Sequence, residues 1–191
     1  PVSMENLRGV RALADKYGKR VVYDSARFVE NAYFIKTREA GYADKTIKEI
    51  VKEIFSLADG MTMSSKKDGL VNMGGFIATK HEDWYEGAKG FCIRYEGFLT
   101  YGGMNGRDMD ALAVGLDENT ELETIETRIK QVQYLAARLD EFGIPYQRPV
   151  GGHALFVDAS LVLTNVPKEE FPAQTLAIEL YKEAGVRGCE I

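Results

Sequence analysis

Asp24 and Arg27 are the first residues in the chain whose types and spacing could perform chemistry. Asp24 ends a short run with β-branched residues, so we expect it just past a buried strand. Ligands of open α/β sheets bind in the crevice at such strand ends. A helix cap, or an ion pair with Arg27, would explain the same carboxylate without catalysis. Taken alone, the pair leaves both interpretations open.

A lysine pair, Lys66 and Lys67, follows the next predicted strand. Successive side chains of an extended segment point to opposite sides, so only one of the two lysines can readily face the crevice. A lysine that lies near another cation and is partly removed from water loses proton affinity and becomes a nucleophile. Ser64 could bind a phosphate group. A solvated lysine pair on a loop is the alternative interpretation.

The order of these residues is more specific than any one of them. Pyridoxal phosphate (PLP) needs an acid at its pyridine nitrogen, a cation near its phenolate oxygen and a lysine for its aldehyde. An aspartate at one strand end, an arginine three residues later and a Ser-x-Lys-Lys at the next strand end supply those groups. The order therefore favours a PLP site.

Hydrophobic spacing predicts the elements that must position these residues. Apolar residues at helical spacing predict helices over residues 4–17 and 46–58, and Gly18 can end the first with a left-handed cap. Short apolar runs predict strands over residues 20–24, 60–64 and 74–78. Strand, helix and strand with short links are typical of a parallel α/β sheet.

The second part of the chain has a different pattern. Residues 109–142 are one long helical stretch that could break near residues 116–120. We expect a strand at 151–158, a helix over 172–184 that begins with Pro172, and another strand at 186–191. The domain boundary is placed near residue 120, between domains of residues 1–120 and 121–191.

The composition excludes several classes of function. A net charge of −5 provides no basic surface for nucleic acid or anionic membranes. The chain lacks the run of about 18 apolar residues that a membrane span needs. Cys92 and Cys189 fit no metal or redox spacing, and two scattered thiols favour a reducing cytoplasm. A first residue other than Met and an apolar last stretch favour a fragment of a longer protein.

Longer stretches resemble the tryptophanase and tyrosine phenol-lyase family of PLP-dependent β-eliminating lyases. YDSARFVENAYFIK (23–36) resembles the family's pyridine-nitrogen segment, and MSSKKDGLVNMGG (63–75) its cofactor-lysine segment. Later stretches also match: YEGFLTYGGMNGRDM (95–109), GGHALFVDA (151–159) and FPAQTLAIELYKEAGVR (171–187). The resemblance covers the chain nearly without gaps.

The resemblance implies a role for each candidate residue. Asp24 would pair with the pyridinium nitrogen and keep it protonated, and Arg27 would lie beside the phenolate oxygen. Lys67 would carry the cofactor and move the Cα proton of the substrate. Ser64 would hold a phosphate oxygen, with Lys66 close to the phosphate as an electrostatic neighbour.

Two further residues are implied at the same site. Asn72 would offer its backbone carbonyl to a potassium ion, for which oxygen ligands are typical. Tyr101, in a glycine-rich turn, would lie close to the reacting groups. The family's phosphate loop would precede Pro1, and the arginine that binds the substrate carboxylate would follow Ile191. The resemblance thus implies that these 191 residues alone are inactive.

The resemblance also implies the fold and the assembly. The fold would be α/β of the aspartate-aminotransferase-like type (fold type I). Residues 1–120 would form the C-terminal part of the large PLP-binding domain, and residues 121–191 a connecting helix and the beginning of the small domain. The full-length protein would be a homotetramer whose active sites are completed across a subunit interface.

The resemblance implies that Ile191 discriminates between the two activities of the family. Phenol-lyases have an arginine directly after the residue matching Glu190, whereas tryptophanases resemble this chain in having isoleucine. An apolar wall suits an indole and leaves no partner for a phenolic hydroxyl. Ile191 therefore predicts conversion of L-tryptophan to indole, pyruvate and ammonia. Residues 105–109 favour a tyrosine phenol-lyase instead. The sequence is also compatible with an aminotransferase or with a non-catalytic PLP-fold scaffold.

Overall fold

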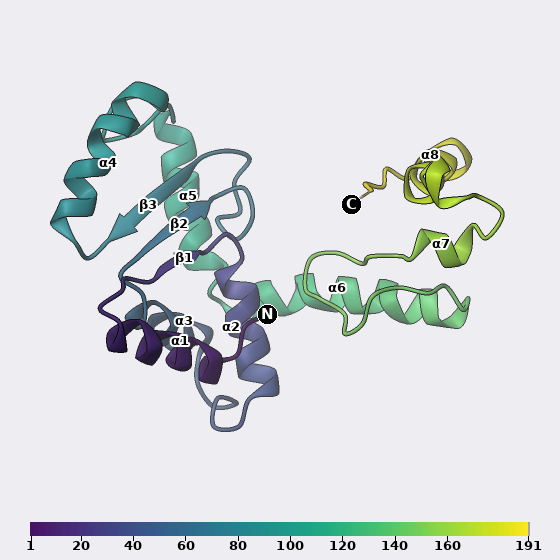
Figure 1. The fold of residues 1–191 in the computed structure, drawn as a ribbon, viewed down its shortest axis with the longest axis horizontal. Coiled ribbons are helices and arrows are strands. Elements are labelled where there is room, and N and C mark those ends of the chain that lie inside the picture. The colour runs from purple at the N-terminus through teal and green to yellow at the C-terminus, as the bar shows by residue number, and fades with distance from the viewer. Residues whose placement is uncertain (191) are drawn as a thin grey trace. The chain divides into compact units, whose positions relative to one another are not determined.

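The computed structural model describes residues 1–190 and divides into two compact units. The first unit comprises residues 1–127, and the second begins at Arg128. The first unit contains a small sheet with helices around it, and the second is helical and irregular (Figure 1). Ile191, the residue predicted to set the specificity, lies outside the described residues.

The sheet of the first unit has three strands in the order β1-β2-β3. They are β1 (Val22–Asp24), β2 (Gly60–Ser64) and β3 (Gly75–Thr79). β1 pairs with β2 in parallel, as predicted, but β3 pairs with β2 in antiparallel orientation. The prediction of a parallel sheet is therefore wrong for β3. Only ten residues separate β2 from β3, too few for the helical crossover that parallel strands need.

β1 was predicted to be a buried strand, and this prediction is also wrong. Val22 is 52% exposed, and the strand begins only at this residue. A strand buried on both faces needs covering layers and neighbours on both edges. β1 pairs with β2 alone and therefore forms an edge of the described sheet.

Five helices accompany the sheet in the first unit. They are α1 (Met4–Lys16), α2 (Phe28–Arg38), α3 (Ile47–Ser56), α4 (Glu82–Tyr95) and α5 (Gly106–Glu118). α1 and α3 confirm the predicted helices, including the left-handed Gly18 after α1, with φ of 58°. α3 begins with a capping box between Thr46 and Glu49. The predictions did not include α2 or α4.

The two missed helices lack the one-sided apolar stripe that identifies a helix in sequence. α2 is buried over most of its circumference, including Val29, Ala32 and Ile35. It packs against α3, and their side chains form the core together with Met4 of α1. α4 is the opposite case: it contacts β3 but has no fully buried residue. Neither pattern has the period of a half-buried helix.

The predicted long helix is broken at the expected place. α5 ends at Glu118, and α6 (Leu122–Glu141) begins three residues after Asn119. Asn119 is buried, with 1% of its surface exposed. No helix among residues 1–190 is long and apolar enough to cross a membrane.

The second unit contains α7 (Ala159–Val162), the 3₁₀ helix η1 (Lys168–Glu170) and α8 (Pro172–Ala184). α8 confirms the predicted helix, with proline in its first turn and a left-handed Gly185 after its end. The strand predicted at 151–158 is absent from the described chain. Only an isolated bridge between Tyr146 and Val157 forms there, because no neighbouring strand extends the pairing. Residues 186–190 are irregular, so the second predicted strand is wrong over its described part.

Candidate active site

The parallel pairing of β1 and β2 brings two of the predicted site segments to one edge of the sheet. Asp24, the last residue of β1, lies opposite Thr62 of β2. The residue after β1 is still hydrogen-bonded to β2, because Ser25 N donates to Thr62 O at 2.8 Å. Asp24 itself is exposed, and its Oδ1 accepts a hydrogen bond from Ala26 N at 3.3 Å. The carboxylate therefore stands at the carboxyl end of the sheet, where ligands bind in α/β folds.

The turn after β2 carries the lysine pair, and the two lysines have different environments. Lys67 is half-buried, and its Nζ donates to Ser64 Oγ at 2.8 Å. Lys66 is exposed. The two lysines thus differ in exposure, but they lie in a turn, so the alternation expected of an extended segment does not apply to them.

Arg27 occupies the N-cap position of α2, three residues beyond Asp24. Its side chain is exposed and does not cap the helix. The segment between them binds the lysine turn directly, since Asp68 N donates to Ala26 O at 3.2 Å. Asp24 and Ser64 therefore end two paired strands, and Arg27 and Lys67 lie on the segments that follow, which are hydrogen-bonded to each other.

Asn72 and Tyr101 are brought toward the same edge by β3. Because β3 is antiparallel to β2, its first residue, Gly75, lies opposite Ser64, and the loop with Asn72 is beside the lysine turn. Met104 packs against Gly74 so closely that an added Cβ would lie 2.5 Å from its sulfur. Tyr101 precedes this contact and is 46% exposed. The segment of Tyr101 thus adjoins the loop that carries Asn72.

Tyr23, the residue before Asp24 in β1, has a neutral side chain. Burial raises the pKa of the Tyr23 phenol above its usual value. The Tyr23 hydroxyl is buried and has no hydrogen-bond partner among the described residues. Alternation along the strand therefore places a neutral phenol on one side and Asp24 on the other.

A family model described as a beta-eliminating lyase matches residues 1–191. The chain belongs to this family. This match confirms the resemblance seen in the sequence. It covers the site segments as well as the second unit.

Curated members of the beta-eliminating lyase family match the whole chain. A probable beta-eliminating lyase of Trichomonas vaginalis is 74% identical over 191 residues, which are 42% of its length. A tyrosine phenol-lyase of Fusobacterium nucleatum is 56% identical over 190 residues, 41% of its length. A tryptophanase of Rhodobacter capsulatus is 53% identical over 191 residues, 42% of its length. The chain thus spans about two fifths of the length of these relatives.

A solved structure supports the fold. A putative aromatic amino acid beta-eliminating lyase/threonine aldolase from Exiguobacterium superimposes with a TM-score of 0.57 at 19% identity. The match covers 88% of this chain and 44% of that one. Together with the family match, it confirms the predicted α/β class of fold type I.

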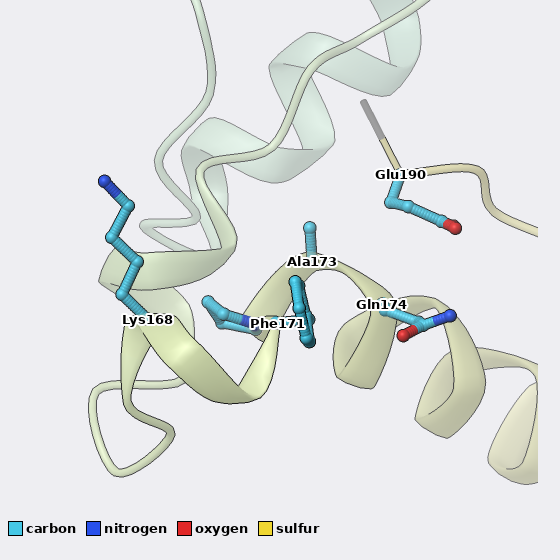
Figure 2. Close-up of a pocket in the computed structure, with 6 residues that line it drawn as sticks. Lys168, Phe171, Ala173, Gln174 and Glu190 are labelled. Carbon is cyan, nitrogen blue, oxygen red and sulfur yellow. The ribbon is translucent and has the colours of Figure 1, made fainter.

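Cavities elsewhere do not include the predicted site residues. An open pocket of about 460 Å³ lies in the second unit, at the start of α8. Figure 2 shows Phe171 directly before this helix and Gln174 on it, with Glu190 of the terminal segment above them. A smaller pocket lies at the opposite end of β2, beside Asp59 and Lys80. Within residues 1–190, no three His, Cys, Asp or Glu side chains gather in a metal-binding group.

Two residues that connect the site were missed by reasoning from the sequence. Asp68 and Asn119 are both buried, with 0% and 1% of their surface exposed. Asn119 Nδ2 donates to Asp68 O at 2.9 Å. The sequence did offer one signal for Asp68, which is its position directly after the lysine pair. Nothing in the local sequence indicates Asn119, because its partner is 51 residues away.

Proposed function

We propose that the full-length protein is a PLP-dependent carbon–carbon lyase that removes the side chain of an aromatic amino acid. The observation that carries this proposal is the hydrogen bond between Lys67 and Ser64 at the strand end next to Asp24. An amine in this position, in a chain of the beta-eliminating lyase family, is suited to carry the cofactor.

The groups present fit PLP. The ends of β1 and β2 and the segments that follow them offer an amine, a hydroxyl, a guanidinium and a carboxylate, which are the donor and acceptor types that the cofactor requires. Lys67 would hold the aldehyde carbon, Ser64 a phosphate oxygen, Asp24 the ring nitrogen and Arg27 the ring oxygen. When bound, PLP would supply an electron sink for the pair left at the substrate Cα.

The chain's own residues would handle the protons. The Nζ of Lys67 would take the Cα proton of the substrate, because an amine displaced from the cofactor is a suitable base. Asp24 would keep a proton at the ring nitrogen facing it. Tyr101 would stand close to the reacting groups as a second proton carrier. Lys66, exposed beside the turn, would attract the phosphate dianion.

We propose L-tryptophan as the preferred substrate, with indole, pyruvate and ammonia as products. The relatives include both tyrosine phenol-lyases and tryptophanases, so they favour neither substrate. The proposal rests on the apolar side chain of Ile191. A pocket without a partner for the phenolic hydroxyl leaves that group unpaired, which disfavours tyrosine.

The experiment is a pyruvate assay of the full-length protein with PLP and potassium, comparing kcat/KM for tryptophan and tyrosine. We expect pyruvate from both and a ratio in favour of tryptophan. A ratio in favour of tyrosine would make the protein a tyrosine phenol-lyase. Cofactor binding without pyruvate would favour a non-catalytic scaffold. Transfer of the amino group to an oxo acid would indicate an aminotransferase.

Lys67→Ala and Lys66→Ala form a matched pair for the same assay. Lys67→Ala should remove turnover, because Lys67 is the amine of this turn that is half-buried and bonded to Ser64, whereas Lys66 is exposed. Lys66→Ala should keep turnover and weaken PLP binding, because an exposed neighbouring charge affects only attraction of the phosphate. Borohydride reduction and peptide mapping should place the label on Lys67. A label on Lys66 would contradict the assignment.

The assembly and setting are further proposals. The full-length protein would be a homotetramer, which size-exclusion chromatography with light scattering measures directly. The carbonyl of Asn72 would bind potassium, and replacing potassium with sodium in the assay should lower the activity. Two free thiols, Cys92 and Cys189, fit a reducing cytoplasm.

A further inference from the structure

We propose that Asp68 is a positioning residue that joins the cofactor-lysine turn to the start of α2 and thereby sets the place of Lys67 relative to Asp24 and Arg27. The inference rests on the proposed function, because it concerns the same site. Asp68 follows Lys67 directly in the chain and has 0% of its surface exposed. A fully buried acidic side chain at this place must be held by specific partners.

The first partner of Asp68 is the N-terminus of α2. Its Oδ2 accepts hydrogen bonds from Val29 N at 2.7 Å and Glu30 N at 3.3 Å. The first N–H groups of a helix have no partner within the helix, and the side chain at the N-cap usually binds them. Here the N-cap is Arg27, which makes no side-chain capping bond. Asp68 caps α2 instead, from 39 residues further along the chain.

This capping has a consequence for the site. It leaves the N-cap position free for an arginine, whose side chain can then bind a ligand. The backbone bond from Asp68 N to Ala26 O, at 3.2 Å, adds a second link between the same two loops. The backbone of residues 26–30 therefore cannot shift without moving the lysine turn.

The second partner of Asp68 is the end of α5. Asn119 is buried and donates its Nδ2 to Asp68 O at 2.9 Å. Beside this bond, Gly115 packs on Gly69 so closely that an added Cβ would lie 2.1 Å from Gly69 O. The residues after Lys67 are therefore clamped between α2 and α5.

The backbone of the lysine turn is strained at Leu70. Leu70 has φ of 55°, a left-handed conformation that is strained for a residue with a branched side chain, and its N donates to Lys67 O at 3.2 Å. Surrounding structure must hold such a conformation in place. Lys67 lies between the end of β2 and this clamped segment, so its side chain starts from a defined position.

The test uses the full-length apoprotein titrated with PLP, with two readouts besides turnover. One is the dissociation constant of PLP, and the other is the midpoint pH of the visible absorbance band. Asp68→Ala should raise the dissociation constant about 10-fold, the lower end of what the loss of an orienting partner costs at ligand sites. It should also move the midpoint pH, because Lys67 would lie at a different distance from the charges of Asp24 and Arg27. Asp68→Asn keeps an oxygen for Val29 N and should restore part of both values.

Thr46→Ala is the matched control. Thr46 caps α3 by accepting from Glu49 N at 3.2 Å, a bond that involves no residue of the lysine turn. Its loss should lower the melting temperature and leave both PLP readouts unchanged. Asn119→Ala removes the hydrogen bond to the Asp68 carbonyl and leaves the Asp68 carboxylate in place. If Asp68→Ala does not fold, this variant tests the positioning role. It should change both readouts in the same direction by a smaller factor.

Three results would overturn the positioning role. The first is parent-like PLP binding by both Asp68→Ala and Asn119→Ala. The second is a raised dissociation constant with an unmoved midpoint pH, which would indicate general loosening only. The third is a parent protein that does not bind PLP, which would also overturn the proposed function. The first two leave the proposed function intact, so the two failures are distinguishable.

Discussion

At the scale of single residues, the proposed PLP site gives Asp24 the most specific role. It ends β1 as an exposed carboxylate at the carboxyl edge of the sheet. Asp24→Asn keeps the size of the side chain but cannot hold a proton at the ring nitrogen of PLP. We expect the full-length variant to bind PLP and to lose pyruvate release by about 100-fold or more, as for other preorganised groups of catalytic sites.

Asp44→Asn is the control for this substitution. Asp44 is an exposed aspartate in the turn before α3, and the change is chemically identical. It should leave PLP binding and pyruvate release at the parent level. Equal activity of Asp24→Asn and Asp44→Asn would show that Asp24 has another role.

At the scale of elements, a cluster around Glu53 joins α1 to α3. Glu53 accepts hydrogen bonds from Lys45 Nζ and Tyr42 Oη, each at 2.8 Å, and from Arg8 of α1. The bond from Lys45 is the main cause that lowers the pKa of Glu53 to about 2. Burial, with the bond to Glu53, raises the pKa of Tyr42 to about 12. The cluster therefore stabilises ionised Glu53 and neutral Tyr42.

Glu53→Gln tests the pH dependence of this cluster. The pKa of Glu53 is lower in the folded protein than the value of about 4.3 in an unfolded chain, so its contribution is present above that pH. It is lost as the pH falls through about 2, below which both states are protonated. We expect Glu53→Gln to lower the melting temperature near neutral pH and to approach the parent as the pH falls through that window.

The exposed pair of Glu86 and Lys89 on α4 provides the comparison for Glu53. Their ion pair is 2.9 Å long, with the Glu86 side chain 55% exposed. Surface pairs of this kind contribute about 0–1 kcal/mol, so Glu86→Gln should change the melting temperature little at any pH. A melting difference for Glu53→Gln that stays constant across the pH range would contradict the ionised role of Glu53.

At the scale of the whole molecule, many large apolar side chains of the described chain are exposed. On and after α4 they include Phe91, Ile93, Tyr95 and Phe98, all above 60% exposed. The chain spans about two fifths of the length of its curated relatives.

Expressing residues 1–191 alone tests whether the site is complete within them. We expect these residues to release no pyruvate from tryptophan or tyrosine, while the full-length protein does. The physical reason is that Asp24 and Arg27 are exposed, so the site is open to water on the side where substrate would bind. Pyruvate release by residues 1–191 at the full-length rate would show that the site is complete here.

The sequence by itself determined features that depend on residues close together in the chain. Helix ends at Thr46, Gly18 and Pro172 were predicted correctly because caps and turns act within a few residues. The segments that carry Asp24 and Lys67 were predicted to form the site from their local order of residue types. The family was recognised from the same stretches.

Only the tertiary structure decided the features that depend on distant partners. The direction of β3 and the absence of a strand at 151–158 depend on which segment of the chain pairs with each of these stretches. The apolar alternation of a stretch does not specify its pairing partner. The same holds for Asp68, whose partners Val29 and Asn119 are 39 and 51 residues away. A buried carboxylate acquires its role from the groups packed around it, and those groups come together only in the folded chain.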